Sequence, residues 1–312
     1  MSTPAAARDD APADPKAPGA PHTPPTAPVG LRAAPVAPIR VAAGQATLVP
    51  LDVPANVATA ARLVARAGDA GAALLVLPEL FLTGYDLPAI VGQPRRYPLR
   101  PDDPRLDVLA AACARARTAA VVGAATHDPG RGTLHISAVV LGRDGARLGR
   151  YDKQHLDPAE LAAGFTPGRA GCTLALDGWR LGLGICWDAS FPGHALAAGL
   201  DGCQAYLVSA MFDRGAGVRK RALLCPARAW DNAGYVVVAN HCARSGPYDG
   251  CGGSGGWGPD GRLLADAGLD DPGLAVVPLE PAAVAEARAG DLPLADPSVD
   301  ARPGPRDLIT VD

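Results

Sequence analysis

From residue 39 onward, the apolar positions of the chain switch repeatedly between strand-like and helix-like spacing. Residues 39–46 form a mostly apolar run that predicts a strand. The next segment repeats apolar side chains every three to four residues, with Pro54 near its start and Gly68 at its end, as in an amphipathic helix. Residues 73–77 are continuously apolar and predict a strand buried on both faces. Strand, helix and strand therefore follow one another within about forty residues.

The same alternation continues to residue 279. Helices are expected around residues 105–117 and 218–232. Strands are expected at residues 119–124, 135–141, 181–185, 205–209 and 235–239, followed by a β-rich stretch at 253–279. Strands that alternate with helices are typical of an α/β fold whose helices cover the faces of its sheets. The pattern predicts one α/β domain without internal repeats.

The two ends of the chain depart from this pattern. Residues 1–38 hold ten of the 32 prolines and little apolar surface to offset the entropy of ordering, so they predict a disordered tail. The last thirty residues, 283–312, are rich in Pro and Asp and predict an extended tail that packs at an oligomer interface. The folded domain is expected to span residues 39–282.

Composition and charge exclude several classes of protein. The 312 residues carry 29 Lys and Arg against 32 Asp and Glu, a formal net charge of −3, and 48% are hydrophobic. A chain this long buries a large core without disulfides. A charge near neutral, without a long basic run, gives no footprint for nucleic acid or an anionic membrane. Because the chain also lacks an apolar run of about 18 residues and a secretory segment, we expect a soluble, cytoplasmic protein.

The cysteines do not form a recognisable framework. Their number is odd, none has the CxxC spacing, and no Cys/His cluster resembles a zinc site. The seven are at positions 113, 172, 186, 203, 225, 242 and 251. Most are expected to be small buried hydrophobes, which leaves the question of whether one of them differs.

Three strand ends carry side chains that can do chemistry. Glu79, Lys153 and Cys186 each follow a predicted strand. The carboxyl edge of an α/β sheet is where such folds gather ligands, and partial burial there raises the pKa of a carboxyl toward that of a useful base. A cysteine that enters a helix-like turn meets backbone N–H groups, which favour a thiolate and can hold an oxyanion.

Each of these residues also has a plain structural interpretation. Glu79 suits a turn that ends a strand, Lys153 a solvated surface charge, and Cys186 a small buried residue. His155, two residues after Lys153, either pairs with a cysteine as a base or has a structural role, and the structural role is favoured. No single segment therefore decides the function.

The combination is more specific, because the order Glu79, Lys153, Cys186, each after its own strand, resembles the carbon–nitrogen hydrolase family, also called the nitrilase superfamily. The resemblance covers roughly residues 39–282. Its blocks are Gln45, Pro-Glu-Leu-Phe-Leu-Thr-Gly-Tyr at 78–85, Lys-Gln-His-Leu at 153–156, Gly-Ile-Cys-Trp-Asp at 184–188 with Phe-Pro at 191–192, Ala-Arg-Ala-Trp-Asp-Asn at 227–232 leading to Asn240, and Gly-Ser at 253–254 leading to Pro-Asp-Gly at 259–261. Their shared order makes the resemblance strong.

The resemblance implies a four-layer αββα sandwich in which Glu79, Lys153 and Cys186 converge as a catalytic triad. Glu160 matches a second glutamate that usually follows the lysine block. Family members often pair two sandwiches, so a homodimer or a larger homo-oligomer is expected. The implied chemistry uses no organic cofactor and no metal, and its partner is a small-molecule amide.

The residue types suit amide hydrolysis through a thioester. A free thiol has a pKa of about 8.5, so Glu79 is needed to take its proton before Cys186 attacks the amide carbon. The Lys153 ammonium and the backbone N–H of Trp187 would stabilise the oxyanion. Glu79 would then protonate the departing ammonia and activate water, while Glu160 positions Lys153 or the substrate amide. Tyr85 and Met211 are expected near the substrate.

Two positions depart from the family pattern and leave the substrate open. Gly193 stands where members commonly carry a glutamate after Phe-Pro, and His135 stands where they usually carry an asparagine. The Cys-Trp-Asp triplet is similar to members that act on amides or N-carbamoyl amines, with nitrile hydrolysis as a further alternative. Two other hypotheses are an inactive scaffold of the same fold and a Cys186–His155 dyad.

Overall fold

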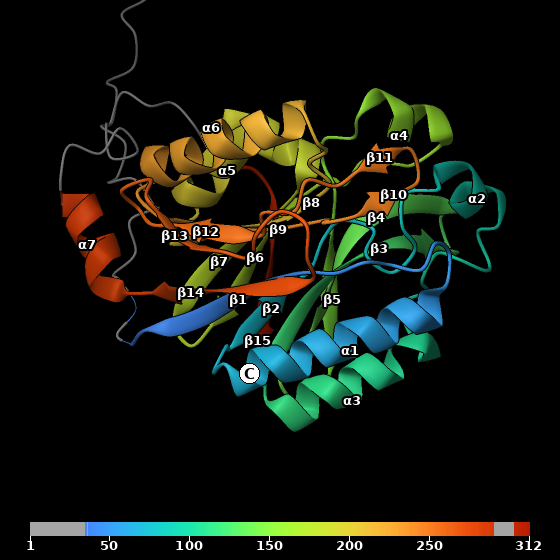
Figure 1. Cartoon of the computed structure of the whole chain (residues 1–312), viewed down its shortest axis with the longest axis horizontal. Coiled ribbons are helices and arrows are strands. Elements are labelled where there is room, and N and C mark those ends of the chain that lie inside the picture. The colour runs from blue at the N-terminus through green and yellow to red at the C-terminus, as the bar shows by residue number, and fades with distance from the viewer. Residues whose placement is uncertain (1–34, 36, 290–302) are drawn as a thin grey trace, which may run out of the picture.

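The computed structural model describes residues 35, 37–289 and 303–312. Two β-sheets lie face to face in the middle of the molecule, and helices cover the outer face of each (Figure 1). This is the four-layer αββα sandwich expected from the sequence. The disordered tail predicted for residues 1–38 lies almost entirely outside the described residues.

The first sheet has six strands in the order β14-β1-β2-β3-β4-β5. Strands β1, β2 and β3 are parallel, whereas β14, β4 and β5 pair with their neighbours in antiparallel fashion. The strands are β1 (Ile39–Gln45), β2 (Leu74–Val76), β3 (Ala119–Asp128), β4 (Thr133–Leu141), β5 (Arg147–Asp152) and β14 (Gly273–Leu279). All three residues of β2 are buried, as expected for a strand covered on both faces.

The second sheet has seven strands in the order β13-β12-β9-β8-β7-β6-β15. Strands β7, β8 and β9 are parallel and form its centre. The strands are β6 (Gly171–Leu176), β7 (Trp179–Ile185), β8 (Ala205–Ala210), β9 (Tyr235–Asn240), β12 (Gly255–Trp257), β13 (Leu263–Asp266) and β15 (Arg306–Val311). A separate short hairpin pairs β10 (Arg244–Ser245) with β11 (Tyr248–Asp249).

Two pairs of helices form the outer layers. Helices α1 (Val53–Asp69) and α3 (Asp107–Ala116) cover the first sheet, and α5 (Pro192–Leu200) and α6 (Ala216–Asp231) cover the second (Figure 1). The other helical elements are α2 (Leu87–Gly92), α4 (Pro158–Ala163), α7 (Pro281–Ala289) and the 3₁₀ turns η1 (Pro104–Leu106) and η2 (Cys186–Ser190). The largest apolar cluster lies between the sheets, and one smaller cluster lies under each helical layer.

Helix α1 illustrates how local sequence signals place an outer helix. The Asp52 side chain accepts a hydrogen bond from the Ala55 N–H at 3.0 Å and so caps the helix, and Pro54 occupies its first turn. The apolar positions of its buried face pack on the first sheet. Gly68 allows α1 and α3 to approach closely, because a Cβ there would lie 2.9 Å from Ala116 Cβ.

The C-terminal region differs from the extended tail expected over residues 283–312. Helix α7 occupies its first part, and residues 306–311 form β15, which pairs in parallel with β6 of the same chain. The reason is that the backbone of β15 extends the edge of the second sheet while Ile309 and Val311 are buried in the apolar layer between the sheets. Local composition does not reveal this long-range pairing. Residues 290–302 lie outside the described residues.

Candidate active site

Four candidate residues meet where strands of the two sheets end. Glu79 follows β2 and Lys153 follows β5, both in the first sheet, whereas Cys186 follows β7 in the second. Glu160 lies in α4, where the Asp157 side chain and the Glu160 side chain form a capping box. The site therefore joins residues from both sheets.

Lys153 is the buried centre of this group. Its Nζ lies 2.6 Å from Glu79 Oε1 and 2.6 and 2.8 Å from the two carboxylate oxygens of Glu160. The side chain is 1% exposed. Burial by itself would lower the pKa of Lys153, but the negative charges of Glu79, Cys186 and Glu160 raise it instead. Lys153 is therefore a permanent ammonium at the bottom of the site.

Glu160 shares this ammonium with Glu79 and is affected by both neighbours. Burial first, and then the negative charge of Glu79, raises the pKa of Glu160 to about 8, although Lys153 opposes the shift. Tyr85 donates a hydrogen bond from its hydroxyl to Glu160 Oε1 at 3.3 Å. Beside the Lys153 ammonium, Glu160 therefore keeps its proton to a higher pH than an exposed glutamate does.

Glu79 has one oxygen free to exchange a proton. Its Oε1 accepts from Lys153, whereas Oε2 is buried and has no hydrogen-bond partner among the described residues. The backbone is fixed from behind, since His241 Nε2 lies 2.6 Å from the Glu79 carbonyl oxygen. Gly123 of β3 is required there, because a Cβ would lie 2.0 Å from the carbonyl oxygen of Pro78. A buried, positioned carboxylate oxygen is suited to general base chemistry.

Cys186 begins the turn η2 in an unusual backbone conformation. Its φ is +42°, in the left-handed region that non-glycine residues rarely adopt and that is enriched at functional sites. The thiol donates a long hydrogen bond to the Met211 carbonyl oxygen at 3.6 Å. Burial first, and then the charge of Glu79, raises the pKa of Cys186 well above its usual value, and Lys153 offsets only part of this. The resting residue is a thiol that needs a base.

Asp188 holds the turn that carries Cys186. Its Oδ2 accepts from the Ile185 N–H at 3.0 Å and from the Tyr151 hydroxyl at 2.7 Å, and its Oδ1 accepts from the His155 N–H at 2.9 Å. His194 extends this network, with Nε2 lying 2.8 Å from the Tyr151 hydroxyl oxygen. Sequence reasoning used Asp188 only as a subtype marker and missed the network, although its signal was the Asp of the Cys-Trp-Asp triplet.

The same network contains three potential metal donors. One ligand atom each of His155, Asp188 and His194 lies within 4.8 Å of the others. These atoms already bond to one another or to Tyr151, since His155 Nδ1 lies 2.9 Å from Asp188 Oδ1 and His194 Nε2 contacts the tyrosine. The arrangement is thus explained by its own hydrogen bonds, and we assign it a structural role.

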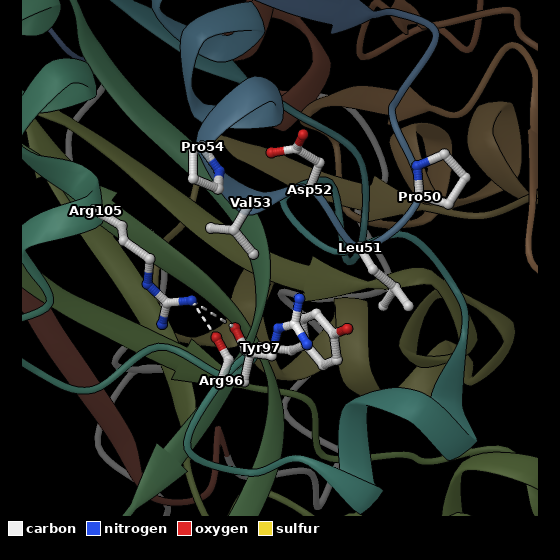
Figure 2. A pocket seen from close by; sticks show the side chains of 8 residues that line it. All are labelled: Pro50, Leu51, Asp52, Val53, Pro54, Arg96, Tyr97 and Arg105. Atoms are coloured by element: carbon white, nitrogen blue, oxygen red, sulfur yellow. Dashed lines mark hydrogen bonds between the residues drawn. The ribbon is translucent and has the colours of Figure 1, made fainter.

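A cavity of about 150 Å³ opens onto Cys186. Its walls contain all three residues that the sequence placed near substrate, Tyr85, Trp187 and Met211. The remaining lining residues are Asp157, Ser190, Phe212, Asp213, Gly217, Lys220 and Tyr248. A second, larger hollow of about 550 Å³ shares none of these residues (Figure 2).

The polar groups that line the larger hollow are not arranged for a reaction. Its Asp52 caps α1, and the Arg105 guanidinium donates to the backbone carbonyl of Arg96 at 2.5 Å and also contacts the Tyr97 carbonyl (Figure 2). These polar groups are used to hold the loops that line the hollow. The cavity at Cys186, a thiol on which the charges of Glu79 and Lys153 act, is therefore the candidate active site.

Comparison with known proteins agrees with this assignment. The sequence model of the family described as Carbon-nitrogen hydrolase matches residues 40–289. The chain belongs to the carbon–nitrogen hydrolase family. A hydrolase from Pseudomonas protegens, described by its position in the pqqF 5′ region, is 34% identical over 274 residues, which cover 86% of this chain and 92% of that protein. Human omega-amidase NIT2 is 28% identical over 69% of this chain and 80% of its own.

Solved structures of carbon–nitrogen hydrolases have the same fold. The amidase from Nesterenkonia sp. AN1, in complex with butyramide, is 32% identical, covers 80% of this chain and 94% of its own, and superposes with a TM-score of 0.70. In another structure of that amidase, a mutant shows covalent addition of the acetamide moiety of fluoroacetamide at the active site cysteine. The family and fold expected from the sequence are therefore confirmed.

Within this carbon–nitrogen hydrolase, the two departures from the family pattern lie outside the triad contacts. A Cβ at Gly193 would meet nothing within 4 Å, so the position at the start of α5 is open. His135 is buried in β4, with Nδ1 2.7 Å from the Thr166 carbonyl oxygen and Nε2 3.0 Å from the Thr133 hydroxyl. His135 thus satisfies its own polar atoms locally.

His155 does not take the place of Glu79. Its ring bonds to Asp188 and stacks on Phe191 with ring centroids 4.2 Å apart. No hydrogen bond to Cys186 from His155 occurs among the described residues, whereas Glu79 and Lys153 dominate the charge around the thiol. This arrangement favours the Glu-Lys-Cys hypothesis over the Cys-His dyad.

All seven cysteines are free, and every one except Cys186 is buried. Cys186 is also the one cysteine that lines the cavity. Across the described part of the chain, we find no helix whose length and apolar character would let it cross a membrane.

Proposed function

We propose that this carbon–nitrogen hydrolase converts a small linear amide to a carboxylate and ammonia through a thioester on Cys186. The observation that carries the proposal is the free Oε2 of Glu79, a carboxylate that is buried beside Lys153 and whose charge acts on the Cys186 thiol at the cavity. A base without a competing partner is what a thiol of raised pKa requires. The similarity to amidases supports the reaction class.

In the first half-reaction, Glu79 takes the thiol proton as the sulfur bonds to the amide carbon. The carbonyl electron pair moves to oxygen, where the Lys153 ammonium and the Trp187 backbone N–H stabilise it. The tetrahedral intermediate collapses as its C–N bond breaks. Glu79 returns the proton to nitrogen, ammonia leaves, and a thioester remains.

In the second half-reaction, Glu79 takes a proton from water, whose oxygen attacks the thioester carbon. The C–S bond then breaks, the sulfur recovers the proton, and the carboxylic acid is released. Glu160 keeps Lys153 in place through two hydrogen bonds, and Tyr85 holds Glu160. Each residue returns to its starting protonation state, so the cycle closes without an external reductant or oxidant.

The test is a panel of butyramide, an N-carbamoyl amine and butyronitrile, scored by ammonia release. We expect turnover of butyramide and its loss in Cys186→Ala. Mass spectrometry of an acid-quenched reaction should show an acyl adduct on the peptide that contains Cys186. Release from the carbamoyl compound alone or the nitrile alone would replace the amidase proposal with one of those activities, and no release from any compound would favour a scaffold role.

We also propose that the chain forms a homodimer or a larger homo-oligomer through the helical layer of its second sheet. Leu223 and Trp230 of α6 are 69% and 67% exposed, and large apolar side chains exposed on one helix are typical of an interaction surface. Sedimentation velocity should give a mass above the 31.6 kDa of one chain, and Trp230→Glu should shift it toward one chain. A wild-type monomer would contradict the proposal. Cytoplasmic location and the absence of nucleic-acid and membrane partners stay predictions.

A further inference from the structure

One cation faces the cavity from the side of α6. Lys220 lines the cavity, and its Nζ lies 4.4 Å from the centroid of the Trp187 ring. Trp187 directly follows Cys186, so the ammonium is next to the space that the acyl part of a substrate would occupy. The Ser190 side chain, from the same turn as Trp187, also lines this space.

The two carboxylates of the cavity wall are already committed to the backbone. Asp157 accepts from the Glu160 N–H at 2.9 Å, and Asp213 accepts from the Gly217 N–H at 3.1 Å. Backbone N–H groups at a helix start stabilise a carboxylate charge. Lys220 differs, because within the described part of the chain no carboxylate oxygen lies within 4.0 Å of its Nζ. Among the described residues, Lys220 is thus the charged group of the cavity wall that has no hydrogen-bond partner, and its ammonium is free to bind a ligand.

We infer that Lys220 makes this site selective for short amides whose acyl chain ends in a carboxylate. The inference rests on the proposed amidase function and adds the substrate class. The amide group lies at Cys186, and the distal carboxylate bonds to the Lys220 ammonium, with the Ser190 hydroxyl as a second donor. The volume limits the acyl chain, since a cavity of about 150 Å³ holds roughly a benzene-sized group.

Lys220 also has a competing structural role, because an ammonium over an indole ring stabilises the position of that ring. Such a role would affect every amide equally, since Trp187 is adjacent to the nucleophile. A binding role would affect only substrates that carry the negative charge. The ratio of kcat/KM between a charged and a neutral amide of equal length separates the two roles.

The experiment compares glutaramate, its neutral counterpart pentanamide and the cationic 5-aminopentanamide. Wild type, Lys220→Met and the control Arg219→Met are assayed for ammonia release. Arg219 is exposed on the same helix and does not line the cavity, so its substitution removes the same net charge. We expect wild type to favour glutaramate over pentanamide. In Lys220→Met this preference should fall about tenfold or more, the usual value of a charge-assisted hydrogen bond, whereas Arg219→Met retains it.

Other outcomes overturn the inference in distinguishable ways. Wild-type turnover of pentanamide without a preference for glutaramate removes the selectivity and leaves the amidase proposal intact. An equal loss on all three amides in Lys220→Met assigns the lysine to the position of Trp187. A preference for 5-aminopentanamide shows that Asp157 and Asp213 set the charge of the cavity. Failure to hydrolyse any of the amides removes both proposals.

Discussion

Glu160→Gln tests whether two carboxylates around one buried ammonium carry an extra proton. In the folded wild type the pKa of Glu160 is raised from 4.5 to about 8 by burial and by Glu79. Folding therefore favours the neutral acid. This stabilisation is complete below pH 4.5 and is lost as the pH rises from there through about 8, because over that range the folded chain keeps a proton that the unfolded chain has already released.

The magnitude follows from that pKa difference. Each tenfold change in proton affinity is worth about 1.36 kcal/mol, so the difference between 4.5 and about 8 corresponds to roughly 5 kcal/mol of unfolding free energy. Glutamine resembles the neutral acid in size and cannot ionise. Glutamine also replaces one of the carboxylate oxygens that accept hydrogen bonds from the Asp157 N–H and the Lys153 ammonium. The resulting loss of unfolding free energy is nearly the same at every pH, so it does not change how the stability difference varies with pH.

The assay is urea unfolding of wild type and Glu160→Gln at pH 5, 7 and 9, followed by circular dichroism. Relative to the variant, wild type should lose several kcal/mol between pH 5 and pH 9. Comparing wild type with the variant cancels the contributions of other titrating groups, such as His241. Burial lowers the pKa of His241 to about 4, so this residue lowers the unfolding free energy only as the pH falls. The control Glu286→Gln changes an exposed glutamate of α7. Parallel curves for wild type and Glu160→Gln, within about 1 kcal/mol, would refute the extra proton.

Three further predictions concern the base, its support and the nucleophile. Glu79→Gln should lower kcat by about 10²–10⁴ with unchanged circular dichroism, and activity within tenfold of wild type would contradict its role as general base. Gly123→Ala should lower the unfolding free energy by about 3 kcal/mol in urea, because its Cβ would lie 2.0 Å from the Pro78 carbonyl oxygen; a loss below about 1 kcal/mol would show that the backbone yields. Iodoacetamide should label Cys186 before the six buried cysteines, at a rate that still rises from pH 7 to pH 9 because its pKa is raised; a plateau in that range would indicate a standing thiolate.

Local sequence patterns predicted the layers of the fold well. The strand at residues 39–46, the helix between Pro54 and Gly68 and the buried run before Glu79 agree with β1, α1 and β2 within a few residues. These elements carry strong periodicity and recognisable ends. The short helix α5 and the edge strand β15 were missed. Both depend on packing against the second sheet, which the sequence of the segment does not encode.

The sequence predicted which residues form the candidate site, but it did not predict their pKa values or the position of Lys220. The motif blocks brought Glu79, Lys153 and Cys186 together, and resemblance added Glu160. That burial and Glu79 together raise the pKa of the thiol, despite the N–H groups of a helix-like turn, depends on the full set of distances. The Lys220 ammonium over Trp187 was equally hidden, since α6 reaches the cavity only through the packing of the second sheet.

Because the site is divided between two sheets, its activity depends on how those sheets pack against each other. Glu79 and Lys153 move with one sheet and Cys186 with the other. The apolar layer between the sheets holds them in register, together with the hydrogen bonds of Asp188 to Tyr151 and of His241 to the Glu79 carbonyl. A small slip of that layer would separate base from nucleophile while every strand keeps its own hydrogen bonds. Large-to-small substitutions in this layer, far from any substrate, would therefore abolish activity before they unfold the protein.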